Sequence, residues 1–288
     1  MRVRLKEKLA GTLQSDALSG VYSSFDLIGD IAIIKTPPDN PEASEAIAKQ
    51  ILQTHRGVKT VLSPTSGVRG EHRIRHLKLL AGENKTVATY KEAGCFFAVD
   101  VEKCYFSPRL SHERLRIASQ VSPGETVVNM FSGVGCFSVI IAKTVPQTTV
   151  YSIDINPAAY QYMVENIRVN RVYGRVHPIL GDSKTAVQTQ LQHVADRVLM
   201  PLPEKALEYL PTAVSALKKS GGWIHYYDFQ HAAKGEEPTE KTERKVAEKL
   251  DSLGVRYMFA CCRVIRPTGP NWFQTVLDIQ VAALPSKF

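Results

Sequence analysis

The sequence predicts an α/β fold, in which a Rossmann-like sheet of seven strands with a late antiparallel hairpin follows a small N-terminal α+β domain. Residues 127–143 read as a buried strand, a glycine turn and an apolar helix. Strands and helices then alternate as far as Gly254, which is typical of a parallel sheet. Two later strand-like runs, Val255 to Ile265 and Trp272 to Ala282, can pair antiparallel, and the six-stranded dinucleotide fold has no such hairpin.

The first domain is expected to span residues 1–103. Apolar and β-branched runs that end at proline or glycine predict its strands, and Asp39 or Asn40 can cap its main helix. We expect residues 63–83 to form a basic loop. The expected elements are an amphipathic helix within 1–20, a strand-rich stretch from Phe25 to Thr36, a helix from Pro41 to Thr54, a strand from Val58 to Leu62, and a hairpin of Lys85 to Lys91 with Cys95 to Val101.

The second domain is expected to span residues 104–288. It opens with a connector and a helix that Ser111 can cap. The remaining expected elements are strands at Thr149 to Asp154, Val176 to Leu180, Ala195 to Met200 and Trp223 to Asp228, with helices at Asn156 to Arg171, Pro203 to Lys219 and Glu236 to Leu253.

The glycine turn predicts a cofactor site. Gly133 and Gly135 allow a tight strand-to-helix turn and leave room for a ligand to approach the main chain. Asp154 ends the next strand 19 residues after Gly135, about the spacing at which a carboxylate meets a ribose diol. Asp182 ends the third strand, where it can reach an adenine edge. An ordinary α/β domain with a packing glycine is the alternative, and the three strand ends together favour an adenosine cofactor.

The glycine spacing alone leaves the kind of adenosine cofactor open. Gly133-x-Gly135-x-x-Ser138 also passes for a degenerate dinucleotide fingerprint. The fourth strand, however, runs into the rigid bend Pro201-Leu202-Pro203, where S-adenosylmethionine enzymes direct backbone toward a planar base. We therefore favour S-adenosyl-L-methionine, which predicts a class I methyltransferase sheet.

Composition favours a polyanionic partner and a reducing compartment. Lys and Arg total 36 against 28 for Asp and Glu, a formal charge of +8. The five cysteines are odd in number and include no C-x-x-C pair, so neither a disulfide framework nor a zinc knuckle is indicated. We find no apolar run of the ~18 residues that span a bilayer and no signal-peptide core at the start. We expect a cytoplasmic monomer that does not bind membranes.

A basic segment in the first domain is suited to phosphate. Arg69, Arg73 and Arg75 crowd together within it. His72 and His76 stand four residues apart, but arginines surround them and no third ligand is near, so we expect no metal site.

Motifs across nearly the whole chain carry a resemblance to a known family. Tyr105-Phe106-Ser107-Pro108-Arg109-Leu110-x-x-Glu113-Arg114-x-Arg116, Met130 to Gly135, Asp154-Ile155-Asn156-Pro157, Gly70-Glu71-x-Arg73 and Ile224-His225-Tyr226-Tyr227 are its parts. With them the chain resembles the archaeal and eukaryotic tRNA (guanine-N1) methyltransferases, which modify position 37 beside the anticodon. The resemblance implies an enzyme that binds the anticodon stem-loop of tRNA.

The resemblance also implies roles for individual residues. Guanosine N1 carries a proton, so its lone pair becomes nucleophilic only as that proton leaves, and a nearby carboxylate can take it. In the family this base is the glutamate that corresponds to Glu113, while Arg109 and Arg73 would hold the purine O6 or flanking phosphates. The residues expected at the cofactor or the target base are Tyr105, Arg114, Asn129, Phe131, Gly133, Gly135, Asp154, Ile155, Asp182 and Pro201.

The sequence departs from the family pattern at two site positions and at its start. Asn129 stands where the family has aspartate, and Pro201 stands where it has the asparagine of Asn-Leu-Pro. About twenty residues are present where many members carry a module for the tRNA elbow. Three alternatives stay open on these grounds: aminocarboxypropyl transfer in wybutosine synthesis, methylation of a tricyclic wyosine precursor, and a non-catalytic tRNA-binding protein. Arg109 and Asp154 speak against the first, and Glu113 with Asp154 and Asp182 against the third.

Overall fold

The computed structural model describes residues 25–36, 40–67 and 70–285. The chain divides after Arg109 into two compact units, a few residues beyond the boundary expected at residue 103. The amphipathic helix expected within residues 1–20 lies outside the described residues, as do Asp39 and Arg69.

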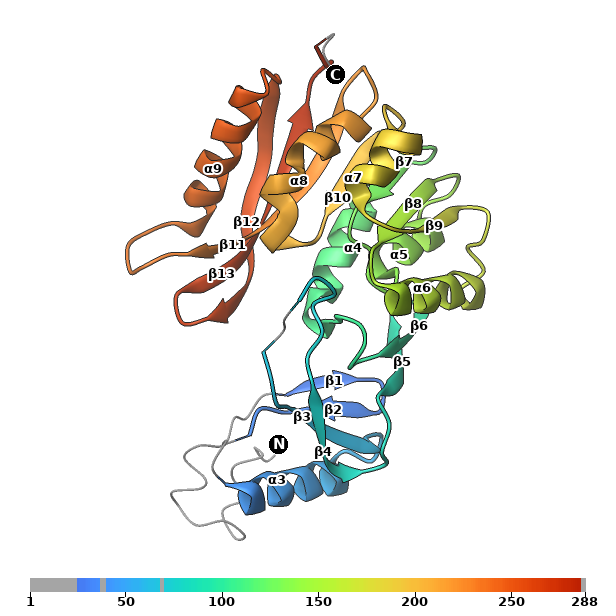
Figure 1. Cartoon of the computed structure of the whole chain (residues 1–288), viewed down its shortest axis with the longest axis vertical. Helices are drawn as coiled ribbons and strands as arrows, with labels where there is room; N and C mark the ends of the chain where they lie inside the picture. The colour runs from blue at the N-terminus through green and yellow to red at the C-terminus, as the bar shows by residue number, and fades with distance from the viewer. Residues whose placement is uncertain (1–24, 37–39, 68–69, 286–288) are drawn as a thin grey trace. The chain divides into compact units, whose positions relative to one another are not determined.

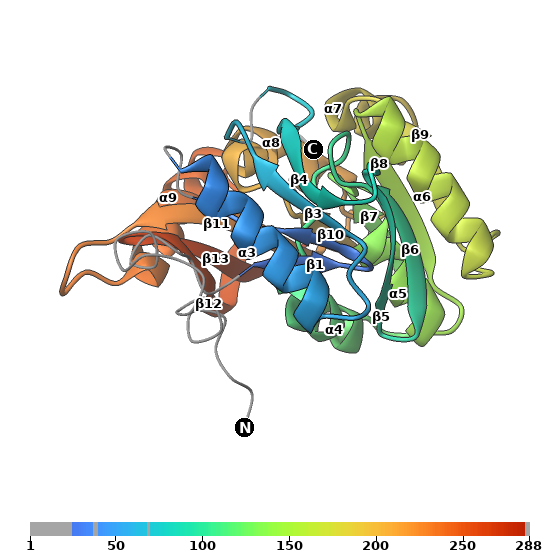
Figure 2. The same ribbon diagram turned by 90° about the horizontal axis from the view of Figure 1, so that it is seen from below.

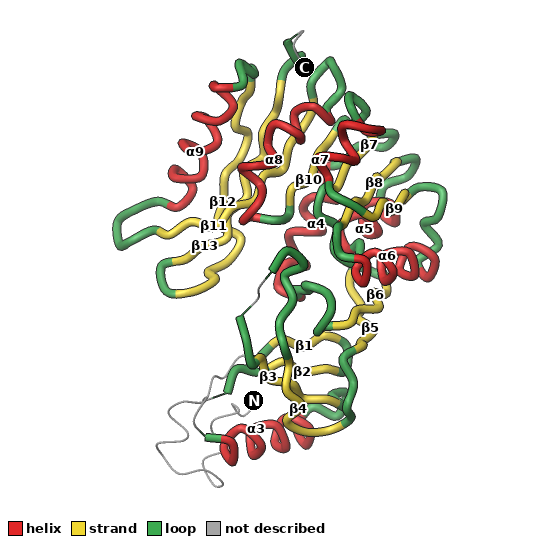
Figure 3. The backbone as a smooth tube through the Cα atoms, viewed as in Figure 1, coloured by secondary structure: helices red, strands yellow, loops and turns green. Residues whose placement is uncertain are grey.

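The first unit combines a four-stranded sheet, ordered β1-β2-β3-β4, with a separate two-stranded hairpin. Figure 3 shows its helix as one long red coil beside these strands. The elements are β1 (Asp26–Ile28), β2 (Ile31–Ile33), α3 (Pro41–Thr54), β3 (Thr60–Pro64), β4 (Leu77–Gly82), β5 (Val87–Glu92) and β6 (Cys95–Asp100).

Helix α3 was predicted at its observed bounds, and the hairpin of β5 and β6 was also predicted. Asn40 caps α3, since its Oδ1 accepts a hydrogen bond of 2.8 Å from the backbone N–H of Ala43. The buried side chains of Ile47 and Ile51 pack with Val61 of β3 in one apolar cluster. An amphipathic helix covering a sheet face is thus the core of this unit.

One expectation for the first unit was wrong, and another lacked detail. The strand-rich stretch expected from Phe25 to Thr36 contains an antiparallel pair, β1 and β2. The chain turns between them at Gly29, whose φ is 58° and where a Cβ would lie 2.4 Å from the carbonyl oxygen of Thr89. The basic loop expected at 63–83 contains β4, which pairs antiparallel with β3. Its half-buried positions lack a clean apolar alternation, so local pattern did not reveal it.

The second unit is built on the predicted seven-stranded sheet, ordered β12-β13-β11-β10-β7-β8-β9. The five strands from β11 to β9 are mutually parallel, and β13 and β12 add the predicted late antiparallel hairpin. The elements are α4 (Ser111–Gln120), β7 (Thr126–Asn129), α5 (Cys136–Thr144), β8 (Thr149–Asp154), α6 (Pro157–Val169), β9 (Val176–Leu180), α7 (Ser183–Ala186), β10 (Arg197–Met200), α8 (Pro203–Ala216), β11 (Gly222–His231), α9 (Pro238–Ser252), β12 (Tyr257–Gly269) and β13 (Trp272–Val281).

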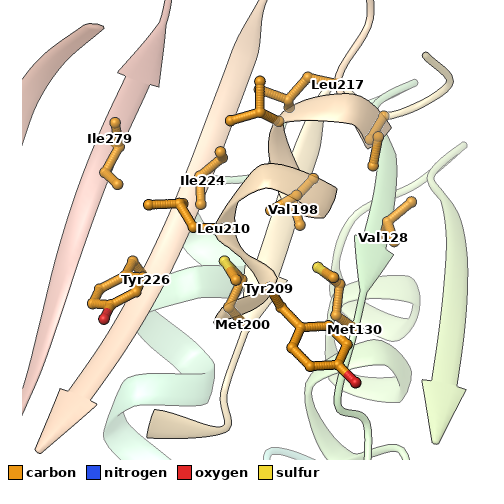
Figure 4. Packing of buried hydrophobic residues seen from close by; sticks show 14 of the residues in the cluster. Val128, Met130, Val198, Met200, Tyr209, Leu210, Leu217, Ile224, Tyr226 and Ile279 are labelled. Carbon is orange, nitrogen blue, oxygen red and sulfur yellow. The ribbon is translucent and has the colours of Figure 1, made fainter. Parts of the chain in front are cut away.

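Helices cover both faces of this sheet. Helices α7 and α8 lie on one face and α4 and α5 on the other (Figures 1 and 2). On the α8 face, Val128, Val198 and Ile224 of neighbouring strands pack against Leu210 of α8, as Figure 4 shows. Among the described residues, no helix is both long and apolar enough to span a membrane.

One cap prediction in this unit was wrong. Ser111 is the first residue of α4 and makes no capping hydrogen bond, and Leu110 stands at the cap position. A 3-10 turn at Pro108–Leu110 leads directly into the helix, which leaves Ser111 inside it. Helix α6, by contrast, begins as predicted, with Asn156 Oδ1 accepting from the N–H of Ala158 at 3.0 Å.

Candidate active site

The carboxyl ends of β7, β8, β9 and β10 meet at one edge of the sheet because these strands are parallel. At that edge Gly133 and Gly135 have φ values of 55° and 90°, which side chains rarely adopt. A Cβ on Gly135 would also lie 3.0 Å from the side chain of Met163. The glycine turn therefore has the backbone path that the sequence predicted for a ligand site.

Asp154 ties the end of β8 to this turn. Its Oδ2 accepts from the N–H of Gly133 at 2.6 Å, and its Oδ1 accepts from the N–H of Asn156 at 2.9 Å. A carboxylate at this position is a group that can accept hydrogen bonds from the hydroxyls of a ribose. Ile155, next to it, is half-buried.

Asn129 provides the test of whether the turn fits a cofactor with an ammonium group. It is fully buried at the end of β7, and its Nδ2 donates to Ser138 Oγ at 3.1 Å. Ser138 in turn pairs with the hydroxyl of Ser152. Asn129 Oδ1 is buried and has no hydrogen-bond partner among the described residues. Such an orphaned acceptor is destabilising by about 1–3 kcal/mol, and the ammonium of S-adenosylmethionine would satisfy it.

Asp182 lies at the head of α7 and is linked to an aromatic pair. Its Oδ1 accepts from the N–H of Lys184 at 2.8 Å, and the hydroxyl of Tyr209 donates to its Oδ2. The ring of Tyr209 meets Phe131 edge-on, with 5.2 Å between centroids. Pro201, half-buried, follows directly on β10. The carboxylate of Asp182 and the rings of Tyr209 and Phe131 are thus linked by direct contacts, and polar and aromatic groups of this kind are suited to binding a planar base.

The side chain of Glu113 is buried and surrounded by hydrogen-bond donors. It lies on α4 with its side chain 1% exposed. Its Oε1 accepts from the hydroxyl of Tyr227 at 2.8 Å and from Arg116 Nη2 at 2.8 Å. Its Oε2 accepts from Arg116 Nε at 2.9 Å and from Arg263 Nη2. We expected a carboxylate within reach of the target base, so the base role stays a prediction that needs one of these donors to leave.

A buried chain of charges continues behind Arg116. Asp278 on β13 accepts from Arg116 at 2.5 and 3.0 Å and from His225 Nδ1 at 2.6 Å. Because Arg197 can only donate, its 2.7 Å contact makes His225 Nε2 an acceptor, which assigns the ring proton to Nδ1. Arg197 ends the chain on Glu125, at 2.8 and 3.1 Å.

Two pKa shifts follow from this chain. Burial lowers the pKa of His225, and Asp278, which acts in the opposite direction, does not offset it. For Asp278, burial alone would raise the pKa, but hydrogen bonds from His225 and Arg116 outweigh it and hold that pKa below its ordinary value. The chain is thus built around a neutral imidazole and an ionised aspartate.

Arg114, also on α4, is buried with its guanidinium 5.9 Å from the centre of the Phe137 ring. Phe137 packs edge-on against Tyr227, at 6.1 Å between centroids. Arg114 is therefore on the same side of the sheet as Glu113.

The predicted site residues of the first unit form their own group. The guanidinium of Arg73 lies 4.2 Å from the ring centre of Tyr105. Arg73 has a φ of 53°, an uncommon value for a residue with a side chain. Arg109 Nε donates to Asp26 Oδ1 at 2.7 Å. Burial lowers the pKa of Arg75, while Asp26 and Tyr105 act in the opposite direction.

Sequence reasoning missed several residues of the buried chain of charges in the second unit. Tyr227 and His225 belong to a motif quoted for the resemblance, but no role was assigned to them. Arg263 and Asp278 were not singled out, and they lie 150 and 162 residues from their partners on α4. Only the pairing of β11, β13 and β12 brings these side chains together, so no local signal could have found them.

Comparison with known proteins decides the family. The TRM5/TYW2 methyltransferase domain matches residues 88–254, more than half of the chain, and the TYW2 N-terminal domain matches residues 5–86. The chain belongs to the TRM5/TYW2 methyltransferase family. Membership confirms the predicted fold class, the predicted enzyme class and S-adenosylmethionine as the cofactor.

Relatives in this family differ in how much of their length the chain covers. It is 40% identical over 260 residues to the tRNA (guanine(37)-N(1))-methyltransferase Trm5b of Pyrococcus abyssi, covering 90% of this chain and 75% of the relative. It is 37% identical over 261 residues to the tRNA 4-demethylwyosine(37)-methyltransferase Taw21 of Saccharolobus solfataricus, covering 90% of this chain and 94% of the relative.

Solved structures of the TRM5/TYW2 family have the same fold. The complex of aTrm5 with tRNALeu superposes with a TM-score of 0.84 at 31% identity, covering 98% of this chain and 79% of that one. Pyrococcus horikoshii TYW2 in complex with MeSAdo gives a TM-score of 0.78 at 28% identity, covering 97% of this chain and 98% of that one.

Proposed function

We propose that the protein transfers a methyl group from S-adenosylmethionine to N1 of guanosine at position 37 of tRNA. The sulfonium of the bound cofactor supplies an electrophilic methyl group. Asn129 would accept a hydrogen bond from the ammonium group of the cofactor, and Asp154 would accept from its ribose hydroxyls. The glycine turn leaves room for the cofactor to approach the main chain. Proximity of the methyl group to the purine then accounts for much of the rate acceleration.

One observation carries this proposal. The second unit contains both the glycine turn and the carboxylate of Glu113, which lies on α4 and accepts a hydrogen bond from Tyr227 of β11. Methylation at N1 needs a proton acceptor, because the nitrogen lone pair is released only as its proton leaves. Arg73 and Arg109 would hold the purine O6 or its flanking phosphates.

A second candidate is methylation of the tricyclic nucleoside 4-demethylwyosine at the same position. Two features favour it: the chain matches Taw21 over nearly its full length, and Pro201 stands where the family resemblance implies the asparagine of Asn-Leu-Pro. Losing that amide removes a hydrogen-bonding side chain expected at the target base. The cofactor half of the site serves both reactions equally.

Nucleoside analysis separates the two candidates. The purified protein is incubated with S-adenosylmethionine and either tRNA bearing guanosine at position 37 or tRNA bearing 4-demethylwyosine there. Digestion and mass spectrometry then identify the product. We expect 1-methylguanosine from the first substrate, and product from the second substrate alone would assign the wyosine reaction instead.

The setting of the reaction is part of the proposal. We infer that the protein works in the cytoplasm, as a monomer, on the anticodon stem-loop of tRNA. The charge of +8 supports an RNA partner. Light scattering of the protein with and without tRNA would show a mass of one chain per tRNA, whereas a dimer would overturn the monomer.

A further inference from the structure

All acceptor positions of Glu113 are taken. A carboxylate offers about four lone-pair positions. Tyr227 and Arg116 occupy those of Oε1, and Arg116 and Arg263 occupy those of Oε2. A purine N1–H has no position left to donate to. If Glu113 is the base, one of these donors must therefore leave before the reaction.

The three donors differ in how firmly they are held. Tyr227 is 1% exposed and lies in the middle of β11. Arg116 is 17% exposed and is fixed from behind by two contacts with Asp278. Arg263 is 41% exposed, and it lies on β12, the edge strand of the sheet. Its Nε has no hydrogen-bond partner among the described residues. Arg263 is the donor most readily exchanged.

We propose that Arg263 is an exchangeable positioning residue, which holds Glu113 in the free enzyme and releases it when a phosphate of the bound RNA takes its guanidinium. This inference rests on the proposed function. A guanidinium binds carboxylate and phosphate with the same planar geometry, so the exchange replaces one charge-assisted pair by another. After it, one lone pair of Glu113 Oε2 can accept the purine proton, while Arg116 and Tyr227 keep the carboxylate in place.

The proposal predicts a split between two pH profiles. The charged and titratable groups that face Glu113 are Arg116 on α4, Tyr227 on β11 and Arg263 on β12, with Asp278 of β13 behind Arg116. Arg263 is a cation in contact with the Glu113 carboxylate, so its removal should change the pH dependence of the rate wherever Arg263 is in place. The pH dependence of the rate constant at limiting RNA reflects ionisations in the free enzyme. The pH dependence of the saturating rate reflects ionisations in the RNA complex, in which Arg263 no longer contacts Glu113.

The test is a single-turnover methyl-transfer assay on tRNA for the wild type, Arg263→Gln and Arg266→Gln. Arg266 lies on the same strand and hydrogen-bonds Gln274, so its variant controls for lost charge on β12. In Arg263→Gln, the acid limb measured at limiting RNA should move to higher pH, and the limb at saturation should stay where it is in the wild type. Arg266→Gln should match the wild type in both profiles.

Two outcomes overturn the inference. Equal movement of both limbs in Arg263→Gln would show that Arg263 stays on Glu113 during the reaction, and movement of neither would show that it does not influence Glu113. The salt dependence of tRNA binding tests whether Arg263 contacts a phosphate. Losing one such contact in Arg263→Gln lowers the slope of log affinity against log salt by about one, and an unchanged slope excludes the contact. If the wild type transfers no methyl group, the proposed function is wrong. The salt slope of tRNA binding would still test whether Arg263 contacts a phosphate.

Discussion

Glu113 and Asn129 are the two side chains of the site whose chemistry depends most on buried hydrogen bonds. Glu113 has every acceptor position engaged, whereas Asn129 keeps one buried acceptor without a partner among the described residues. The first arrangement leaves no acceptor of Glu113 unsatisfied before substrate binds. The second is destabilising until a donor arrives. Substitution of Glu113 should therefore affect the rate of methyl transfer, and substitution of Asn129 should affect cofactor binding.

Replacing Glu113 by glutamine removes the proton acceptor but keeps the shape of the side chain. We expect Glu113→Gln to lower the single-turnover rate of methyl transfer by about 100-fold or more, with little loss of cofactor binding. Calorimetry with S-adenosylhomocysteine would measure that binding. Glu165→Gln, at an exposed position of α6, serves as the control with a normal rate. A near-normal rate in Glu113→Gln would remove Glu113 as the base.

Replacing Asn129 by alanine removes the buried acceptor. A hydrogen bond to a charged group contributes about 1.5–3 kcal/mol, so Asn129→Ala should weaken binding of S-adenosylmethionine by about tenfold or more. Ser152→Ala is the matched control, because it alters the same buried chain without removing the amide. Equal affinities for Asn129→Ala and the wild type would show that this oxygen does not bind the cofactor.

The sequence predicted these residues unevenly, for a physical reason. Gly133 and Asp154 lie at the ends of consecutive strands, and strand ends can be located from local pattern, whereas Asn129 was identified through the family resemblance. The partners of Glu113 come from β11 and β12, far along the chain, and their positions depend on strand register. The family resemblance identified Glu113, but only the fold revealed how it is held.

Strands β11 and β13 are joined across the sheet by a buried ion chain. His225 pairs in register with Asp278, and the two side chains meet in a hydrogen bond of 2.6 Å. Because burial lowers the pKa of His225, the folded protein holds its imidazole neutral at pH values where the unfolded chain takes up a proton. The element is therefore sensitive to acid.

Acidification should weaken the fold through His225. Below about pH 6.5 the unfolded chain binds the His225 proton and the folded protein does not, so the free energy of unfolding falls as pH falls. This group contributes a slope of at most about 1.4 kcal/mol per pH unit. The lowered pKa of Asp278 adds a further loss only below about pH 4.

Urea unfolding between about pH 7 and pH 5 measures this slope. We expect His225→Gln to have a smaller slope than the wild type, whatever its absolute stability. His231→Gln, at an exposed position near the end of the same strand, should keep the wild-type slope. Identical slopes for His225→Gln and the wild type would contradict a neutral buried imidazole.

At the level of elements, the sequence located most helices and strands of the second unit but not β4 of the first. Parallel strands that are buried on both faces are visible as continuous apolar runs. Strand β4 is partly exposed and lies beside a basic segment, so its pairing with β3 defines it more than the pattern of its own residues does. The hairpin of β1 and β2 depended likewise on a single glycine.

The whole molecule carries a charge of +8, which should govern its association with RNA. Each phosphate contact made by Lys or Arg releases counterions, so affinity for tRNA should fall steeply as salt rises. Arg73→Gln and Arg75→Gln, each in the full chain, should lower that slope by about one. A flat response of the wild type to salt would contradict backbone contacts by the basic segment.

Transfer of methyl, rather than of another part of the cofactor, is the central claim about the molecule. The most direct test incubates the protein with unmodified tRNA and S-adenosylmethionine labelled either in its methyl group or in its carboxyl group. The methyl label should enter tRNA at position 37 while the carboxyl label stays in solution. Incorporation of the carboxyl label would show aminocarboxypropyl transfer and contradict the account. If neither label enters tRNA, whether position 37 carries guanosine or 4-demethylwyosine, the account is contradicted as well.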